Sequence, residues 1–263
     1  MPEEPLIQLR GVSVRFGRQE VLRGIDLDIL PHQSVCVLGE SGCGKTVLLK
    51  LLVGLLKPTA GEVLFEGRTL ASRDERELTA MRLRMGFLFQ QAALFDSMNV
   101  YENVSFGLHA KRGLDEAEIH NRVKDRLKEV GLPASAETKM PAQLSGGMRK
   151  RVGLARALAL DPDVMLYDEP TTGLDPIMSD VINELIIRSR TRREVMSVIV
   201  THEMKTVQKV ADRVVMLYPL SRLKADVKQI LYDGPAAGLA SAEDARVRQF
   251  IEGNASDRLS SEE

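Results

Sequence analysis

The sequence predicts an α/β fold in which crossover helices connect the strands of a parallel sheet. Strand and helix patterns alternate through the second half of the chain, and a buried-type strand at 34–38 runs into a glycine-rich turn and a helix. Such alternation is typical of parallel sheets, because each parallel connection needs a crossover. The chain has 263 residues, 44% of them apolar, which suits one large domain, with or without an inserted lobe.

Hydrophobic periodicity, together with turn and capping residues, predicts the individual helices and strands. Short strands are expected at 7–9, 12–14, 34–38, 63–65, 164–167, 195–201, 213–217 and 230–232. Helices are expected at 45–56, 115–130, 149–159, 176–189 and 203–211. The clearest is 115–130, since Asp115 and Glu118 have the spacing of a capping box and Gly131 suits the C-terminal stop.

Composition and charge exclude several classes of protein. Lys plus Arg is 36 and Asp plus Glu is 37, so nothing in the charge favours a nucleic-acid partner. Two cysteines, Cys36 and Cys43, indicate reduced thiols in a cytosolic protein. The acidic N-terminus does not resemble a signal peptide, and the longest apolar stretch, 47–56, is too short to span a bilayer. The polar tail from 254 is expected to be disordered.

A glycine-rich segment at 39–46 fits the pattern G-x-x-x-x-G-K-[ST] and lies between an expected strand and an expected helix. Glycines let successive backbone N–H groups point at phosphate oxygens, and the helix adds its positive end. Lys45 is expected to reach the β- and γ-phosphates, and the Thr46 hydroxyl to ligate Mg²⁺. A chance glycine turn is the competing interpretation.

Two further motifs fit the same chemistry. The apolar run 164–167 ends in Asp168 and Glu169. Asp168 is expected to hold Mg²⁺ through water and Glu169 to orient or deprotonate the attacking water. Ser145 precedes the helix at 149–159, with Gly146 and Gly147 between, so it can cap that helix, and the capped end can bind an anion.

Taken in order, these motifs resemble the nucleotide-binding subunits of ABC transporters. The resemblance rests on 39–46, Gln90 after 87–89, 144–147, Asp168-Glu169, 173–175 and Thr201-His202. It implies one ABC ATPase domain, 1–263: a P-loop NTPase parallel-sheet core with an antiparallel β subdomain (1–90 and 161–235), an inserted α-helical subdomain (91–160) and a C-terminal extension (236–263).

The resemblance also implies the ligands and the residues that bind them. ATP and Mg²⁺ are the expected cofactors, with Glu169, His202, Gln90 and Lys45 catalytic. Ser145 and Gly147 are implied to bind ATP held by a second subunit, and Asp175 to bridge the two. The implied nucleotide contacts are Phe16, Val21, Gly39, Ser41, Gly42, Cys43, Gly44, Lys45, Thr46, Gln90, Ser145, Gly147, Asp175 and His202, and the implied metal ligands are Thr46, Gln90 and Asp168.

Within that family the chain is most similar to the ATPases of the Mla and Mce lipid-trafficking systems, on the stretches 88–100, 144–148 and 246–250. The similarity implies phospholipid movement between the membranes of a double-membraned bacterium. Implied partners are a second ATPase subunit, membrane permease subunits, a small regulatory subunit and an Mce-type lipid-binding protein, with no nucleic acid. The implied location is the cytoplasmic face of the inner membrane. Alternatives are transport of an amino acid or organic solvent, a soluble ABC ATPase acting on DNA or ribosomes, and a non-catalytic scaffold.

Several positions carry separate expectations. Met148 replaces the usual Gln of the signature, and Val47 lacks the hydroxyl that many relatives have there. The apolar residues 92–95, Met98, Val100 and Tyr101 are expected to form a groove that docks a permease helix. The competing interpretation is that Leu94 and Phe95 belong to the core of the lobe. Cys43 is expected to be more reactive than Cys36, because a helix N-terminus and Lys45 both favour thiolate. The stretch 219–226 has no assigned role.

Overall fold

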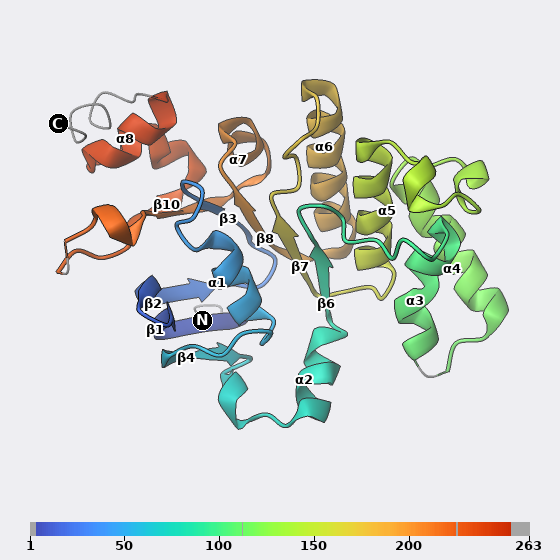
Figure 1. Cartoon of the computed structure of the whole chain (residues 1–263), viewed down its shortest axis with the longest axis horizontal. Coiled ribbons are helices and arrows are strands. Elements are labelled where there is room, and N and C mark those ends of the chain that lie inside the picture. Colours follow the sequence, from blue (N-terminus) through green and yellow to red (C-terminus); the bar gives the residue numbers. More distant parts are fainter. Residues whose placement is uncertain (1–3, 112, 225, 254–263) are drawn as a thin grey trace. The chain divides into compact units, whose positions relative to one another are not determined.

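The computed structural model describes residues 4–111, 113–224 and 226–253; the tail from 254 lies outside them. The chain divides into two compact units, one made of Met1–Ser72 with Val200–Glu263 and the other of Arg73–Ile199. Figure 1 labels the elements of both. The first unit is discontinuous in sequence, and the second is one continuous segment.

The first unit contains an antiparallel sheet in the order β2-β1-β4-β5. Its strands are β1 (Ile7–Phe16), β2 (Gln19–Ile29), β4 (Ala60–Phe65) and β5 (Arg68–Thr69). The two strands expected at 7–9 and 12–14 are one strand, β1, whose register shifts between Leu9 and Val12. Gly11, with φ +57°, provides the irregularity, which keeps both Leu9 and Val12 buried.

The same unit contains the strand that precedes the phosphate loop. β3 (Ser34–Leu38) pairs in parallel with β9 (Arg213–Leu217), and β10 (Ile230–Pro235) pairs antiparallel with β9. The helices are α1 (Lys45–Leu52), α7 (Met204–Val210) and α8 (Ala245–Glu252). α1 ends four residues earlier than expected, because Gly54 takes a left-handed φ of +66° just past its C-terminus.

The second unit places helices around parallel strands. β6 (Met85–Leu88) and β7 (Val164–Asp168) pair in parallel, in the order β8-β7-β6. The division between the units falls within β8 (Met196–Thr201). The helices are α2 (Glu75–Arg82), α3 (Val100–Ala110), α4 (Glu116–Glu129), α5 (Gly146–Leu158) and α6 (Pro176–Arg193). The predicted α/β class, with parallel and antiparallel strand pairs, is confirmed.

The predicted capping box of α4 is present. The Glu118 N–H donates to Asp115 Oδ1 at 2.8 Å, and the Asp115 N–H donates to Glu118 Oε2 at 3.1 Å. Gly131 stops the helix with φ +69°. α4 packs against α3 and α5, and all three lie within the segment expected to form the inserted subdomain, whose bounds stay a prediction. Among the described residues, no helix combines the length and apolar character that crossing a membrane requires.

Candidate functional site

The phosphate loop joins β3 to α1 in the first unit and needs its glycines for two reasons. Gly39, Gly42 and Gly44 have φ values of +155°, +81° and +102°, which side chains on L-residues disfavour. A Cβ on Gly39 would lie 2.4 Å from Leu217 O, and one on Gly44 would lie 2.7 Å from Leu22 Cδ2. Both the conformation and the close packing of the loop therefore require glycine at these two positions.

Lys45 places a buried cation inside this loop. Its side chain is 6% exposed, and Nζ donates to the carbonyl oxygens of Gly39 and Glu40, both at 2.9 Å. A desolvated ammonium interacts more strongly with an anion than an exposed one does. Thr46 follows in the first turn of α1. The loop thus brings a cation, a hydroxyl and a helix N-terminus together in one short segment, as the sequence predicted.

Cys43 of the phosphate loop is more deeply buried than the expected reactivity suggests. Its thiol is 1% exposed, and burial raises the pKa of Cys43, with the Lys45 charge opposing the shift but not overcoming it. Lys45 does favour the thiolate, as expected, but desolvation is the larger effect, so the net shift in the pKa of Cys43 is upward. Burial also raises the pKa of Cys36, in β3. The reactivity ranking of the two thiols stays a prediction.

The other predicted residues of the first unit lie at strand ends. Phe16 closes β1 and is 50% exposed, so its ring is available for stacking. Val21 lies in β2 and is partly exposed. His202 follows β8 and is exposed, next to Thr201, whose Oγ1 accepts from the Glu203 N–H at 3.0 Å.

In the second unit Asp168 ends β7 and Glu169 follows it; they are 5% and 8% exposed. Glu169 has a left-handed backbone, φ +48°, a conformation that costs about 1–3 kcal/mol in a non-glycine residue. Side chains of Lys150 and Thr172 help to hold it there, as does the Thr172 N–H, which donates to the Glu169 carbonyl at 3.3 Å. Lys150 Nζ donates to the Glu169 carbonyl at 3.0 Å, and Thr172 Oγ1 donates to Glu169 Oε2 at 3.1 Å. The carboxylate is therefore buried and oriented.

Two predicted residues begin helices in the second unit. Ser145 caps α5, since its Oγ accepts from the Met148 N–H at 3.2 Å. Asp175 caps α6, accepting from the N–H groups of residues 177 and 178, each at 3.0 Å. A Cβ on Gly147 would lie 2.7 Å from Met178 Cε of α6. The N-terminus of α5 is therefore packed closely against α6 at the signature glycine.

Gln90 is exposed and begins a strained loop. Ala92 and Ala93 both have left-handed backbones, with φ +61° and +47°. The guanidinium of Arg156, from α5, donates to the carbonyls of both residues at 2.8 and 2.9 Å. It also lies over the ring of Phe95, 5.5 Å from the centroid. One side chain therefore holds the loop and touches the surface expected to dock a permease.

That surface carries an exposed aromatic pair. Phe95 and Phe106 are 40% and 50% exposed, with ring centroids 4.8 Å apart. The Asn103 side chain accepts from the Phe95 N–H at 2.8 Å and donates to the Phe95 carbonyl at 3.1 Å. Exposed neighbouring aromatics on a fixed backbone are typical of a partner surface.

The sequence did not identify Lys150 and Arg156 as functional candidates. Both lie on α5, and both bind main-chain carbonyls of distant segments. A basic residue on a helix normally indicates a solvated face, so the pattern carried no signal for either.

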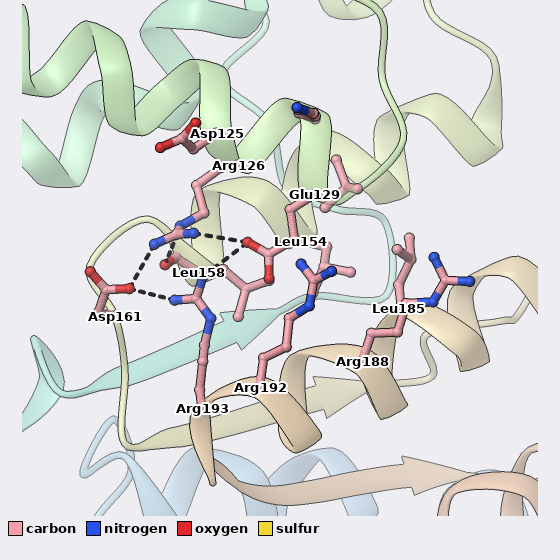
Figure 2. A pocket seen from close by; sticks show the side chains of 12 residues that line it. Asp125, Arg126, Glu129, Leu154, Leu158, Asp161, Leu185, Arg188, Arg192 and Arg193 are labelled. Carbon is pink, nitrogen blue, oxygen red and sulfur yellow. Dashed lines mark hydrogen bonds and ion pairs between the residues drawn. The ribbon is translucent and has the colours of Figure 1, made fainter.

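A cavity of about 660 Å³ lies in the second unit, and Figure 2 shows the side chains that line it. Glu129 and Asp161 each pair with Arg126 and Arg193 on its wall. The network joins α4, the segment after α5 and the C-terminal end of α6. No predicted site residue lines this cavity.

Residues 22–172, more than half of the chain, match the family model described as ABC transporter. The chain belongs to the ABC transporter family. ATP binding, and ATP hydrolysis coupled to transport, come with that membership.

Named relatives are similar over nearly the whole chain. The intermembrane phospholipid transport system ATP-binding protein MlaF of Haemophilus influenzae is 38% identical over 248 residues, covering 94% of this chain and 90% of that protein. The probable ribonucleotide transport ATP-binding protein mkl of Mycobacterium leprae is 38% identical over 253 residues, covering 96% and 70%.

Solved structures agree on the fold. The dimeric ATP-binding cassette MJ0796, in a post-hydrolysis state bound to ADP and Pi, has a TM-score of 0.74 and 32% identity, covering 80% of this chain and 94% of that one. The cbiO1 protein of Clostridium perfringens has a TM-score of 0.78 and 26% identity, covering 98% and 100%.

Proposed function

We propose that this chain hydrolyses ATP to drive phospholipid transport between the membranes of a double-membraned bacterium. The observation that carries the proposal is the similarity to MlaF, which extends over 94% of the chain and includes the segment 88–100. Membership of the ABC transporter family indicates the ATPase activity, and the similarity to MlaF supports phospholipid as the transported substrate.

In the proposed mechanism, residues of this chain bind parts of ATP or act on the attacking water. Lys45 and the N–H groups of the phosphate loop bind the β- and γ-phosphates. The Glu169 carboxylate orients or deprotonates the attacking water, and His202 contacts the γ-phosphate. Phe16 stacks on the adenine. The buried, oriented carboxylate of Glu169 supports this assignment, because a fixed base needs no reorganisation during reaction.

A second copy of the chain completes the site in this proposal. Ser145 and Gly147 of the partner subunit contact the γ-phosphate, and Asp175 bridges the two copies. The capped, glycine-rich start of α5 supports this arrangement, since a helix N-terminus favours an anion. The solved relative bound to ADP and Pi is itself dimeric.

Mg²⁺ is the metal that the donor set fits. Thr46 offers a hydroxyl, Gln90 an amide carbonyl and Asp168 a carboxylate, all hard oxygen donors with one negative charge among them. Such a sparse set suits an ion that keeps several waters and also binds substrate phosphates. When bound, the ion neutralises phosphate charge during hydrolysis.

Proposed partners beyond the second copy are membrane permease subunits, a small regulatory subunit and an Mce-type lipid-binding protein. On this proposal the chain sits on the cytoplasmic face of the inner membrane. The Phe95–Phe106 pair is the proposed permease contact, since Arg156 connects it to the loop that follows Gln90.

Reconstitution tests the substrate. The complex purified with its native membrane subunits is placed in liposomes with acceptor vesicles, and transfer of a labelled phospholipid is followed with ATP and with the Glu169→Gln variant. ATP-dependent transfer that the variant loses supports the proposal. The mkl relative's name favours a second candidate, ribonucleotide transport, so nucleotide flux is measured in parallel. Nucleotide flux without lipid transfer would select that candidate and exclude lipids.

The docking role of Phe95 has its own test. Phe95→Asp should leave the isolated subunit folded and able to bind ATP, because the ring is 40% exposed, while co-purification with the permease fails. Leu83→Asp, at an equally exposed apolar position, is the matched control and should still co-purify. A lowered melting temperature in the Phe95 variant alone would contradict a docking role.

A further inference from the structure

Residues 218–224 and 226–229, between β9 and β10 in the first unit, form a projecting segment that we call the strap. The Tyr218 N–H donates to the Gln229 carbonyl at 3.0 Å and closes its base. A short 3₁₀ turn, Leu220–Arg222, lies within it. The strap overlaps the stretch 219–226, which has no role assigned from sequence, and its side chains reach the phosphate loop.

Gln229 is the most deeply buried contact of the strap. The residue is 1% exposed. Its Nε2 donates to the main-chain carbonyls of Val21 and Cys43, both at 3.1 Å. Its Oε1 accepts from the Arg23 N–H at 2.9 Å. Both N–H bonds and the oxygen of one amide are thus used to join β2 to the phosphate loop.

These contacts fall on the two ends of the proposed nucleotide site. Val21 belongs to the strand beside the proposed adenine-stacking ring, and Cys43 belongs to the loop proposed to bind phosphates. The distance between adenine and phosphates in ATP is set by the nucleotide. A bridge that fixes the spacing of these segments before binding therefore lowers the ordering cost of binding.

The strap makes further contacts with the same region. Arg222 forms an ion pair with Glu40 of the phosphate loop and lies over the Tyr218 ring, 5.2 Å from its centroid. The Arg23 guanidinium donates to the Lys224 carbonyl at 3.3 Å. The loop is therefore held from the strap by a buried amide at Cys43 and a partly exposed ion pair at Glu40.

We propose that Gln229 is a positioning residue for ATP, and that the strap holds the phosphate loop in its nucleotide-binding conformation. The inference rests on the proposed nucleotide site. Gln229 acts through main-chain atoms and touches no reacting group, so it affects ground state and transition state alike. Such uniform effects appear in KM and leave kcat unchanged.

Two variants of the full chain test this. Gln229→Met keeps the length of the side chain and removes the bridge, and its Kd and KM for MgATP should rise about threefold to tenfold, with kcat at saturating ATP unchanged. Arg222→Ala should raise both by about twofold to fourfold, and Arg222→Lys should recover most of that. Lys228→Ala removes an exposed charge in the same strap and is the matched control.

The outcomes distinguish a failure of the positioning role of Gln229 from a failure of the proposed nucleotide site. A wild-type chain that binds no ATP would overturn the proposed site itself. Normal wild-type binding, with unchanged Kd in a folded Gln229→Met variant, would overturn the positioning role alone. A fall in melting temperature without any change in KM would also overturn it, as would an equal shift in the Lys228→Ala control. The Arg222 pair keeps the test decisive if the Gln229 variant does not fold.

Discussion

The phosphate loop and the loops of the second unit both turn the chain through left-handed backbone, but by different means. The phosphate loop uses Gly39, Gly42 and Gly44, for which such angles carry little cost. The loops of the second unit that carry Gln90 and Glu169 use Ala92, Ala93 and Glu169, where each left-handed residue costs about 1–3 kcal/mol. The residues of the phosphate loop adopt these angles at little cost, whereas the other two loops need contacts that offset the cost.

One helix, α5, contacts both loops, and Thr172 also holds Glu169. Lys150 binds the carbonyl of Glu169, and Arg156 binds the carbonyls of Ala92 and Ala93. The same helix begins at Ser145. Two cations on the signature helix therefore bind main-chain carbonyls of the strained segments next to the proposed base and next to Gln90.

The largest expected effect tests the chemistry of the strained region. Glu169→Gln keeps the shape of the side chain and removes the base, so turnover should fall by ~10²–10⁴-fold while ATP still binds. Steady-state hydrolysis and nucleotide affinity measure the two parts separately. Near-normal turnover would contradict the role given to Glu169.

Lys150→Met comes next. It removes a charged donor from the buried Glu169 carbonyl, which keeps the Thr172 N–H as a donor, so the free energy of unfolding should fall by about 1–3 kcal/mol. Displacing a catalytic group lowers rate sharply, so turnover should fall by about tenfold to a hundredfold. Lys124→Met, at an exposed position on α4, is the control for denaturant melts and hydrolysis. Equal behaviour of the two variants would exclude a supporting role for Lys150.

Ala93→Gly tests the strained backbone of the second unit by relieving the strain instead of removing a contact that offsets it. Glycine removes the steric cost of the left-handed backbone, so unfolding free energy should rise by about 1 kcal/mol. Ala117→Gly, on an exposed helical position of α4, should instead lose about 1 kcal/mol. If urea melts show both variants destabilised alike, the backbone at Ala93 is not strained.

The smallest effect concerns the phosphate-loop thiol. Burial raises the pKa of Cys43 above its ordinary value of 9.0, so the folded state retains the proton longer than the unfolded state. This contribution to stability is present below pH 9 and is lost as pH rises toward the folded pKa. Alkylation of the native chain at pH 8 should accordingly be slower than alkylation in denaturant. Mass spectrometry after a timed reaction with iodoacetamide checks this, and faster reaction of the native thiol would contradict it.

Local signals allowed much of the fold to be predicted. β3, β9 and the boundaries of α4 follow from short apolar runs and one capping box. β2 was missed because its inward residues Leu22 and Ile25 are three apart, which breaks the alternation expected of a strand. α3 was missed although Asn99 and Glu102 form a capping box of the same kind.

The candidate site divides in the same way. Glycines, the lysine and the carboxylates of the motifs are visible in sequence because their chemistry lies in the side chain. Lys150, Arg156 and Gln229 are not, because their partners are carbonyl oxygens of distant segments. Every residue has a main-chain carbonyl, so such a hydrogen bond places no requirement on the type of the accepting residue and cannot be recognised from the sequence.

The interrupted first unit also sets the order in which a nascent chain can fold. β3 is buried along its whole length, yet its parallel partner β9 begins at Arg213, beyond the entire second unit. At synthesis rates of 5–20 residues per second, β3 waits roughly 10–30 s for that partner. The second unit, continuous in sequence, can fold on the ribosome during this interval. β3, unpaired with β9 during this interval, is a natural target for a chaperone.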